Sequence, residues 1–217
     1  MEPSTKIHVP KHSVDNQDAQ SIIDTARKVL KIESHAIAEL GSRIDSQFVD
    51  VVHHLNKCKH LVITGVGKSG LIGKKISSTF SSIGLPSLFL HASEASHGDL
   101  GMISDGDTVI AISNSGETEE IVKLLPVFNR IQCTLVGMTG NMQSSLAKRS
   151  DYVLNVRVKE EACSKTWFPQ PAQLPPWQWV THLPWHSWNF EEFRKRILPS
   201  TIPAAVSVES YSLRLTI

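Results

Sequence analysis

Residues 61–70 read Leu-Val-Ile-Thr-Gly-Val-Gly-Lys-Ser-Gly and change character halfway along. The first half is a short, nearly continuous apolar run, which is typical of a strand covered on both faces of a parallel sheet. The second half is rich in glycine and leads into a helix-length stretch over residues 71–82. Glycines let the backbone turn tightly, and free amides at the start of a helix form an anion site. This stretch therefore predicts a strand, an anion-binding turn and a helix, although the spacing of a P-loop is absent.

Four further apolar runs follow this stretch, separated by helix-length segments. They are residues 87–91, 108–113, 134–138 and 152–156. Strand–helix alternation of this kind predicts an α/β domain with a doubly wound, parallel, five-stranded sheet. Ligands of such sheets bind beyond the carboxyl ends of the strands, so the residues that follow each run are the candidates for a site.

The residues before this region have a different pattern. Residues 1–15 are polar and predict a loose, disordered tail. Over residues 16–57, apolar residues recur at three- and four-residue spacing in two runs, with Gly41 between them as a helix terminator. We expect a pair of amino-terminal helices that forms a packing or oligomer surface.

Charge and composition argue against several classes of protein. The chain has 217 residues with 22 Lys+Arg and 21 Asp+Glu, so no global field would attract nucleic acid or an anionic membrane. No apolar run approaches the roughly eighteen residues of a membrane span, and the amino terminus lacks the apolar core of a signal peptide. Three widely spaced cysteines argue against disulfides and against a zinc site. We expect a cytoplasmic protein with no metal, no nucleic-acid partner and no membrane partner.

A second donor-rich loop follows the apolar run at residues 108–113. Its residues are Ser113, Asn114, Ser115, Gly116, Glu117 and Thr118. The hydroxyl and amide donors of this loop suit the three oxygens of a phosphate group. The alternative is that Ser115 or Thr118 only caps the helix that follows. Because the turn that contains Gly67 and Ser69 offers donors after another strand, we favour phosphate binding.

Three titratable side chains lie in loops that follow strands. His97, in the segment Glu-Ala-Ser-His-Gly-Asp, could be an acid, a base or an orienting donor, or simply a surface residue. The loop from Ser113 to Thr118 is hereafter called the serine loop. Glu120 begins the helix after it and could merely favour the helix dipole. Glu161 follows the last apolar run and could be plain solvated charge.

Taken together, these motifs resemble the sugar isomerase (SIS) domain. The resemblance rests on the glycine-lysine-serine loop, the His-Gly-Asp loop, the Ser-Asn-Ser-Gly-Glu-Thr loop and the closing Glu-Glu-Ala-Cys, and it runs from about Val62 to Cys163. The resemblance to the bacterial D-arabinose 5-phosphate isomerases is greater still. These enzymes supply a precursor for the synthesis of Kdo, a component of lipopolysaccharide. The resemblance implies a flavodoxin-like SIS fold and interconversion of D-arabinose 5-phosphate and D-ribulose 5-phosphate. It further implies that no cofactor is needed and that the protein is a homo-oligomer, commonly a tetramer in the family.

The resemblance also implies roles for individual residues. Lys68, Glu120 and Glu161 match catalytic residues of the family, and His97 matches a residue of the same pocket that we group with them. An enediol mechanism needs a carboxylate to move a proton between neighbouring carbons, and a cation near the developing oxyanion. We expect Glu161 or Glu120 to be the base and Lys68 to stabilise charge. SIS domains also serve as non-catalytic sugar-phosphate-binding modules, but such modules need only the phosphate loops and not the two carboxylates.

The resemblance stops near Ser164, where the composition changes. All five tryptophans lie within 22 consecutive residues, from Trp167 to Trp188, and seven of the eleven prolines fall from Pro169 onward. The family continues instead with a segment of the type Ala-Pro-Thr-Ser-Thr-Thr. A His-Pro-Gly-Gly turn with another catalytic His follows there, and usually two CBS modules.

A shifted reading frame accounts for this change. Residues 201–209 can be encoded as ACC ATC CCG GCG GCA GTC TCG GTC GAG, and a shift by one base gives His-Pro-Gly-Gly-Ser-Leu-Gly-Arg. The same shift over residues 165–179 permits Asn-Leu-Val-Pro-Thr-Ala-Ser-Thr-Thr-Ala-Thr-Met-Ala-Met. We therefore expect one base to be missing near the codons for Ser164 to Thr166.

The frame shift has consequences for the domain organisation. We expect a sugar-phosphate domain over residues 58–164 and a poorly ordered tail over residues 165–217, because the tail was not selected to pack. We also expect isomerase activity to be reduced or lost, which would make the chain an inactive product. The alternative is that the tail is a novel Trp-rich binding arm.

Overall fold

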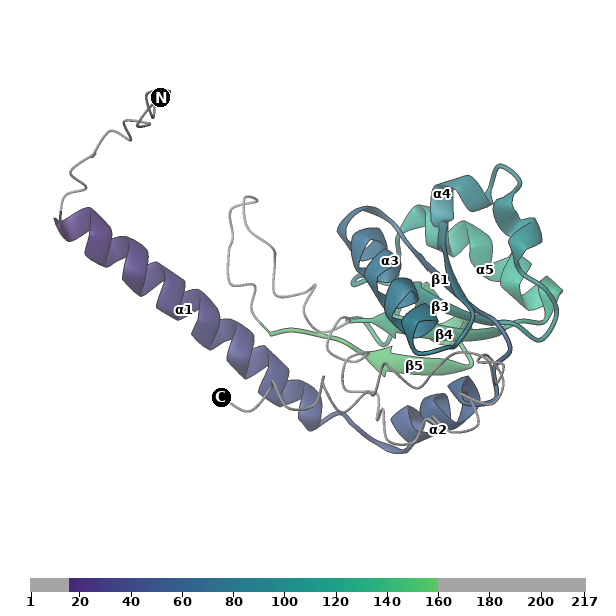
Figure 1. Cartoon of the computed structure of the whole chain (residues 1–217), viewed down its shortest axis with the longest axis horizontal. Coiled ribbons are helices and arrows are strands. Elements are labelled where there is room, and N and C mark those ends of the chain that lie inside the picture. Colours follow the sequence, from purple (N-terminus) through teal and green to yellow (C-terminus); the bar gives the residue numbers. More distant parts are fainter. Residues whose placement is uncertain (1–15, 160–217) are drawn as a thin grey trace, which may run out of the picture.

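A parallel sheet forms the centre of the computed structural model, which describes residues 16–159. Its five strands follow the order β2-β1-β3-β4-β5, and all neighbouring strands are parallel (Figure 1). Their bounds are β1 (Leu61–Gly65), β2 (Ser87–His91), β3 (Thr108–Ile112), β4 (Thr134–Thr139) and β5 (Tyr152–Asn155). The predicted doubly wound, five-stranded sheet is confirmed, with each strand ending within one residue of its apolar run. The predicted tails at residues 1–15 and 165–217 lie outside the described residues.

Helices cover both faces of the sheet. They are α1 (Asn16–Gly41), α2 (Ser46–Leu55), α3 (Gly67–Ser82), α4 (Ala92–Ala95), α5 (Glu119–Ile131) and α6 (Ser145–Arg149), with a 3-10 turn, η1, at Asp99–Met102. One core packs α2 and α3 against Ile63 of β1, and the other packs α4, α5 and α6 against Val62 of the same strand. Successive strand residues point to opposite faces, so β1 to β4 contribute to both cores, whereas β5 contributes to the first core only. This two-sided burial explains why the strands are apolar runs without alternation.

Helix α2 belongs to the sheet domain by its packing. Asp45 caps the helix by accepting a hydrogen bond from the backbone N–H of Phe48 at 3.2 Å. Val51 and Leu55 are buried in the same core as Ile63 and Leu154. The boundary that the sequence suggested between residues 57 and 58 therefore does not coincide with a break in the core.

Helix α1 extends away from the sheet, and only its last turns lie near the rest of the described chain (Figure 1). Leu40 is buried in the core, whereas the side chains of Ile22 and Leu30 are each 64% exposed. The apolar stripe of this helix is therefore left uncovered within residues 16–159.

Candidate functional site

The loops after β1, β2 and β3 begin side by side at one edge of the sheet. Gly65, the last residue of β1, is in register with His91 of β2 on one side and with Ile112 of β3 on the other. The chain runs from β1 to one neighbour and later returns to the other, so this edge is the topological switch point of the sheet. Ligands of doubly wound domains bind at such a point.

Three glycines shape the turn between β1 and α3. A Cβ added at Gly65 would lie 3.1 Å from backbone atoms of Ser69 and Gly70, so the strand end and the first turn of the helix approach more closely than a side chain allows. Gly67 has a φ of +57°, in the left-handed region that favours glycine. The helix starts at Gly67 and places Lys68 exposed and Ser69 half-buried in its first turn.

The loop from Ser113 to Thr118 is held by its own hydroxyl groups. The buried Ser113 hydroxyl lies 2.7 Å from the Thr118 hydroxyl and accepts a hydrogen bond from the Gly116 N–H at 3.0 Å. Ser115 Oγ accepts from the Glu117 N–H at 3.2 Å. Within residues 16–159, the backbone N–H groups of Asn114, Ser115 and Thr118 donate to no acceptor. These three donors are therefore free to bind an anion.

The helices that follow β1 and β3 start without a side-chain cap. Val66 precedes α3 and Thr118 precedes α5, and neither side chain bonds an amide of the first turn. By contrast, the starts of α2, α4 and α6 are capped by Asp45, His91 and Ser144. Thr118 does not cap α5, because its hydroxyl bonds Ser113 instead. The Ser115 hydroxyl accepts from the Glu117 N–H, which lies in the loop before the helix, so it does not cap the first turn of α5 either. Two uncapped helix starts at adjacent strand ends form an anion-binding arrangement.

The other predicted catalytic residues come from separate elements. His97 lies exposed in the turn between α4 and η1, and Glu120 lies half-buried in the first turn of α5. Helices α4 and α5 contact each other, which brings these two segments to the same face of the sheet. Among the described residues, no hydrogen bond or ion pair joins Lys68, His97 and Glu120 to one another. Glu161 lies outside the described residues.

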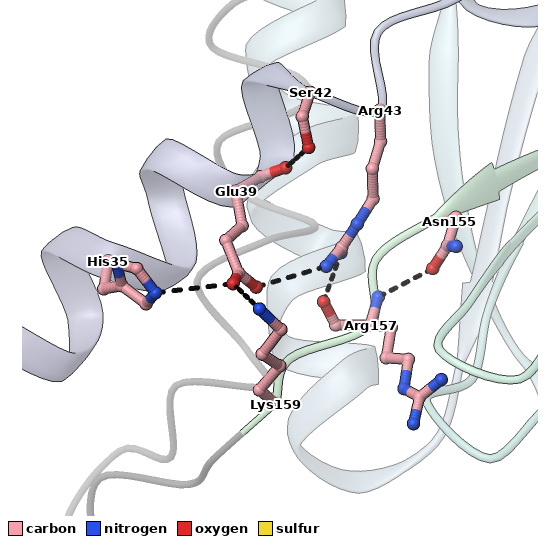
Figure 2. Close-up of polar contacts among 7 residues, drawn as sticks. All are labelled: His35, Glu39, Ser42, Arg43, Asn155, Arg157 and Lys159. Atoms are coloured by element: carbon pink, nitrogen blue, oxygen red, sulfur yellow. Dashed lines mark hydrogen bonds and ion pairs between the residues drawn. The ribbon is translucent and has the colours of Figure 1, made fainter.

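A polar cluster around Glu39 attaches α1 to the chain that leaves β5 (Figure 2). The Glu39 carboxylate lies 3.5 Å from the Arg43 guanidinium and 3.4 Å from the His35 ring, and it accepts a hydrogen bond from Lys159 Nζ. Arg43 also donates to the backbone oxygen of Arg157. The hydrogen bond from Lys159 is the main reason that the pKa of Glu39 lies below its ordinary value. The cluster therefore fixes residues 157–159, which precede Glu160 and Glu161 in sequence.

Sequence reasoning missed two groups of contacts, one at the chain that leaves β5 and one beside the serine loop. The Glu39 cluster joins α1 to residues beyond β5, and the connection between β4 and α6 lies against the serine loop. Neither group forms a recognisable motif, because the partners are far apart in sequence.

Metal-binding and membrane-spanning features are absent from the part of the chain that the structure describes. Residues 16–159 contain no group of three or more His, Cys, Asp or Glu side chains placed to hold a metal ion. None of their helices combines the length and apolarity needed to cross a membrane. Cys58 and Cys133 are both free, and burial raises the pKa of the Cys133 thiol to about 11.

The sheet, its switch point and the two donor-rich loops define an α/β domain with a candidate anion site. Comparison with known families gives the particular class. The family model described as the SIS domain matches residues 54–174, and the chain belongs to this family.

Named relatives are similar to part of the chain. This chain is 45% identical over 151 residues to the arabinose 5-phosphate isomerase KdsD of Shigella flexneri. The match covers 69% of this chain and 46% of that protein. The chain is 47% identical over 142 residues to the KdsD of Pseudomonas aeruginosa, covering 65% of this chain and 44% of that protein. The chain therefore spans less than half the length of these curated relatives.

A solved structure shows the same fold over most of the described region. The Escherichia coli CFT073 protein c3406 in complex with arabinose 5-phosphate has a TM-score of 0.72 and 33% sequence identity, and the match covers 84% of this chain and 99% of that chain.

Proposed function

We propose that this chain derives from an aldose–ketose isomerase that interconverts D-arabinose 5-phosphate and D-ribulose 5-phosphate. The observation that carries the proposal is the pair of uncapped helix starts, after β1 and β3, at the switch point of a SIS sheet. Free amides of the serine loop add donors for the phosphate group. The similarity to the two KdsD proteins supports arabinose 5-phosphate as the substrate.

The residues of the site support an enediol mechanism. Lys68, in the first turn of α3, stabilises the oxyanion that develops when the carbonyl is polarised. A carboxylate, Glu120 or Glu161, moves the proton between the neighbouring carbons, and His97 donates to the sugar from the loop after β2. The phosphate binds to the serine loop, which holds the sugar in place relative to these groups.

We also propose that residues 165–217 are read in a shifted frame, so that the isomerase activity of the chain as printed is reduced or lost. Sequencing the DNA around the codons for Ser164 to Thr166 tests this directly. A missing base there supports the proposal. An intact stretch with no latent frame that encodes Ala-Pro-Thr and His-Pro-Gly-Gly segments would contradict it.

An assay of two proteins tests the catalytic proposal. The chain as printed and a version with the frame restored after Ser164 are each incubated with D-arabinose 5-phosphate, and the formation of D-ribulose 5-phosphate is measured. We expect turnover in the restored protein and little or none in the printed chain. Equal turnover in the two proteins would contradict the proposal that the shifted tail reduces activity. Turnover in neither protein would contradict the proposal that the chain derives from an isomerase.

A binding measurement, compared with turnover, distinguishes an enzyme from the main alternative, a non-catalytic sugar-phosphate-binding module. Calorimetric titration of both proteins with D-arabinose 5-phosphate and inorganic phosphate reports binding without turnover. Binding by a restored protein that does not catalyse the reaction would favour the module.

We further propose a cytoplasmic homo-oligomer, in which the exposed apolar stripe of α1 contacts a second copy. The exposure of Ile22 and Leu30 supports this, because isolated helices of this kind bury their apolar face in an interface. Light scattering of the wild-type chain and of the Ile22→Asp, Leu30→Asp double variant measures the mass. A monomer in both would contradict the proposal.

A further inference from the structure

The connection between β4 and α6 lies directly against the serine loop. The Asn114 backbone oxygen accepts hydrogen bonds from the Gly140 N–H at 2.9 Å and from the Thr139 hydroxyl at 3.2 Å. The Gly116 oxygen accepts from the Leu146 N–H at 3.1 Å. Two backbone oxygens of the loop are therefore fixed by residues 139–146, which comprise the end of β4, the connection and the start of α6.

The two segments pack without any spare room at Gly116. A Cβ added there would lie 2.0 Å from Ser144 Oγ and 2.8 Å from Thr139 Oγ1. The φ of Gly116 is +67°, which already favours glycine. The position of Ser144 therefore restricts the shape that the loop can take.

Glu117 makes a further contact between the two segments. Its Oε1 accepts a hydrogen bond from the Ser145 N–H at 2.7 Å, at the first residue of α6. Another amide of that turn, the Ala147 N–H, donates to Ser144 Oγ at 3.2 Å. The bond from Ser145 is the main reason that the pKa of Glu117 lies below its ordinary value, and Lys148 adds a smaller effect.

A carboxylate in a loop that binds a dianion is unfavourable unless it is turned away and compensated. The Ser145 N–H and Lys148 provide this compensation for Glu117. Glu117 also lies between Gly116, which bonds to α6, and Thr118, which precedes α5. Its side chain therefore joins the loop, at a position just before α5, to the start of α6.

We propose that Glu117 is a positioning residue for phosphate binding, which holds the amides and hydroxyls of the serine loop in their binding arrangement by bonding to the start of α6. The inference rests on the proposed function, because it assumes that the serine loop binds the phosphate group of the substrate.

Three variants, each made in the chain as it stands and in the frame-restored protein, test this role. Glu117→Ala removes the acceptor, Glu117→Gln keeps an acceptor oxygen without the charge, and Glu119→Gln removes a charge two residues away that pairs with Lys123 at 2.6 Å. The dissociation constant for inorganic phosphate is measured by calorimetry, and KM and kcat are measured with D-arabinose 5-phosphate.

We expect Glu117→Ala to weaken phosphate binding and to raise KM by about three- to tenfold, as is typical for loss of a solvent-exposed hydrogen bond, with kcat nearly unchanged. Glu117→Gln should restore most of the binding, and Glu119→Gln should leave it unchanged. A fall in melting temperature with unchanged phosphate affinity and KM would mean that Glu117 serves only stability, and would overturn the inference. A loss of kcat rather than of binding would overturn it as well.

The phosphate titration keeps the two proposals apart. If the parent protein binds phosphate but does not catalyse isomerisation, the proposed function fails while the role of Glu117 is still measured by the affinities. If the parent protein binds no phosphate, the inference about Glu117 is wrong.

Discussion

Gly116 is a residue of the candidate site with little freedom to change. Its positive φ and its contact with Ser144 act together, since any side chain there is both strained and overlapping. Gly106 has a φ of +78° but nothing within 4 Å of an added Cβ. The two glycines therefore separate the cost of backbone strain from the cost of overlap.

Gly116→Ala is expected to destabilise the protein more than Gly106→Ala. The strain of a left-handed backbone costs about 1–2 kcal/mol in both variants, and overlap adds about 1–3 kcal/mol at Gly116 alone. Urea unfolding measures the difference in the free energy of unfolding. Phosphate affinity should fall only in Gly116→Ala. Equal destabilisation by the two variants would show that the loop can move away from Ser144.

The two candidate bases can be distinguished by replacing each glutamate with glutamine. In the frame-restored protein, Glu120→Gln and Glu161→Gln are both expected to lower kcat, because each carboxylate is proposed to act on the substrate. The larger loss, of about 10²–10⁴-fold, identifies the residue that transfers the proton. Steady-state kinetics with D-arabinose 5-phosphate measure kcat, with Glu119→Gln as the matched control. Full activity in Glu120→Gln would exclude that residue from the chemistry.

At the scale of the elements, α2 has two unlike faces. Val51 is completely buried against the sheet, whereas Val49, two residues earlier, is 48% exposed. The helix contacts β5 and covers the same face of the sheet as α3. Its contribution to stability should therefore come from one face only.

Val51→Ala and Val49→Ala provide a matched test of this packing. The buried substitution should lower the free energy of unfolding by about 2–3 kcal/mol, from lost apolar burial and the cavity that remains. The exposed substitution should change it by less than about 0.5 kcal/mol. Chemical denaturation measures both values. A negligible effect of Val51→Ala would mean that α2 is not part of the cooperative core.

For the molecule as a whole, His54, Glu39 and Glu117 are three of the described groups whose lowered pKa values favour loss of stability in acid. Burial lowers the pKa of His54 below its ordinary value of 6.5, against a smaller opposing effect of Asp151. Hydrogen bonds to Lys159 and Ser145 lower the pKa values of Glu39 and Glu117 below 4.5. In each case the unfolded chain binds protons more readily than the folded chain, so stability falls as the pH falls.

Stability is expected to decline in two stages as the pH falls. The contribution of His54 is present above about pH 6.5 and is lost as the pH falls toward its lower, folded-state pKa. The contributions of Glu39 and Glu117 are lost below about pH 4.5. Urea unfolding between about pH 2 and pH 8 measures the profile. His54→Gln should remove the first stage, whereas His53→Gln, at the exposed neighbouring position, should retain it. An unchanged slope in His54→Gln would contradict the assignment.

The amino-acid sequence by itself determined the five strands, their alternation with helices, and the two loops that carry Lys68 and Ser113. Buried parallel strands are continuous apolar runs, and glycines and serines after them mark the loops, so these features are local in sequence. Only the tertiary structure decided that α2 shares the core, that Thr118 leaves α5 uncapped, and which partners the acidic side chains find. Glu117 bonds Ser145 across 28 positions and Glu39 bonds Lys159 across 120. Contacts at such separations depend on how the chain folds back on itself, and no local pattern of residues predicts them.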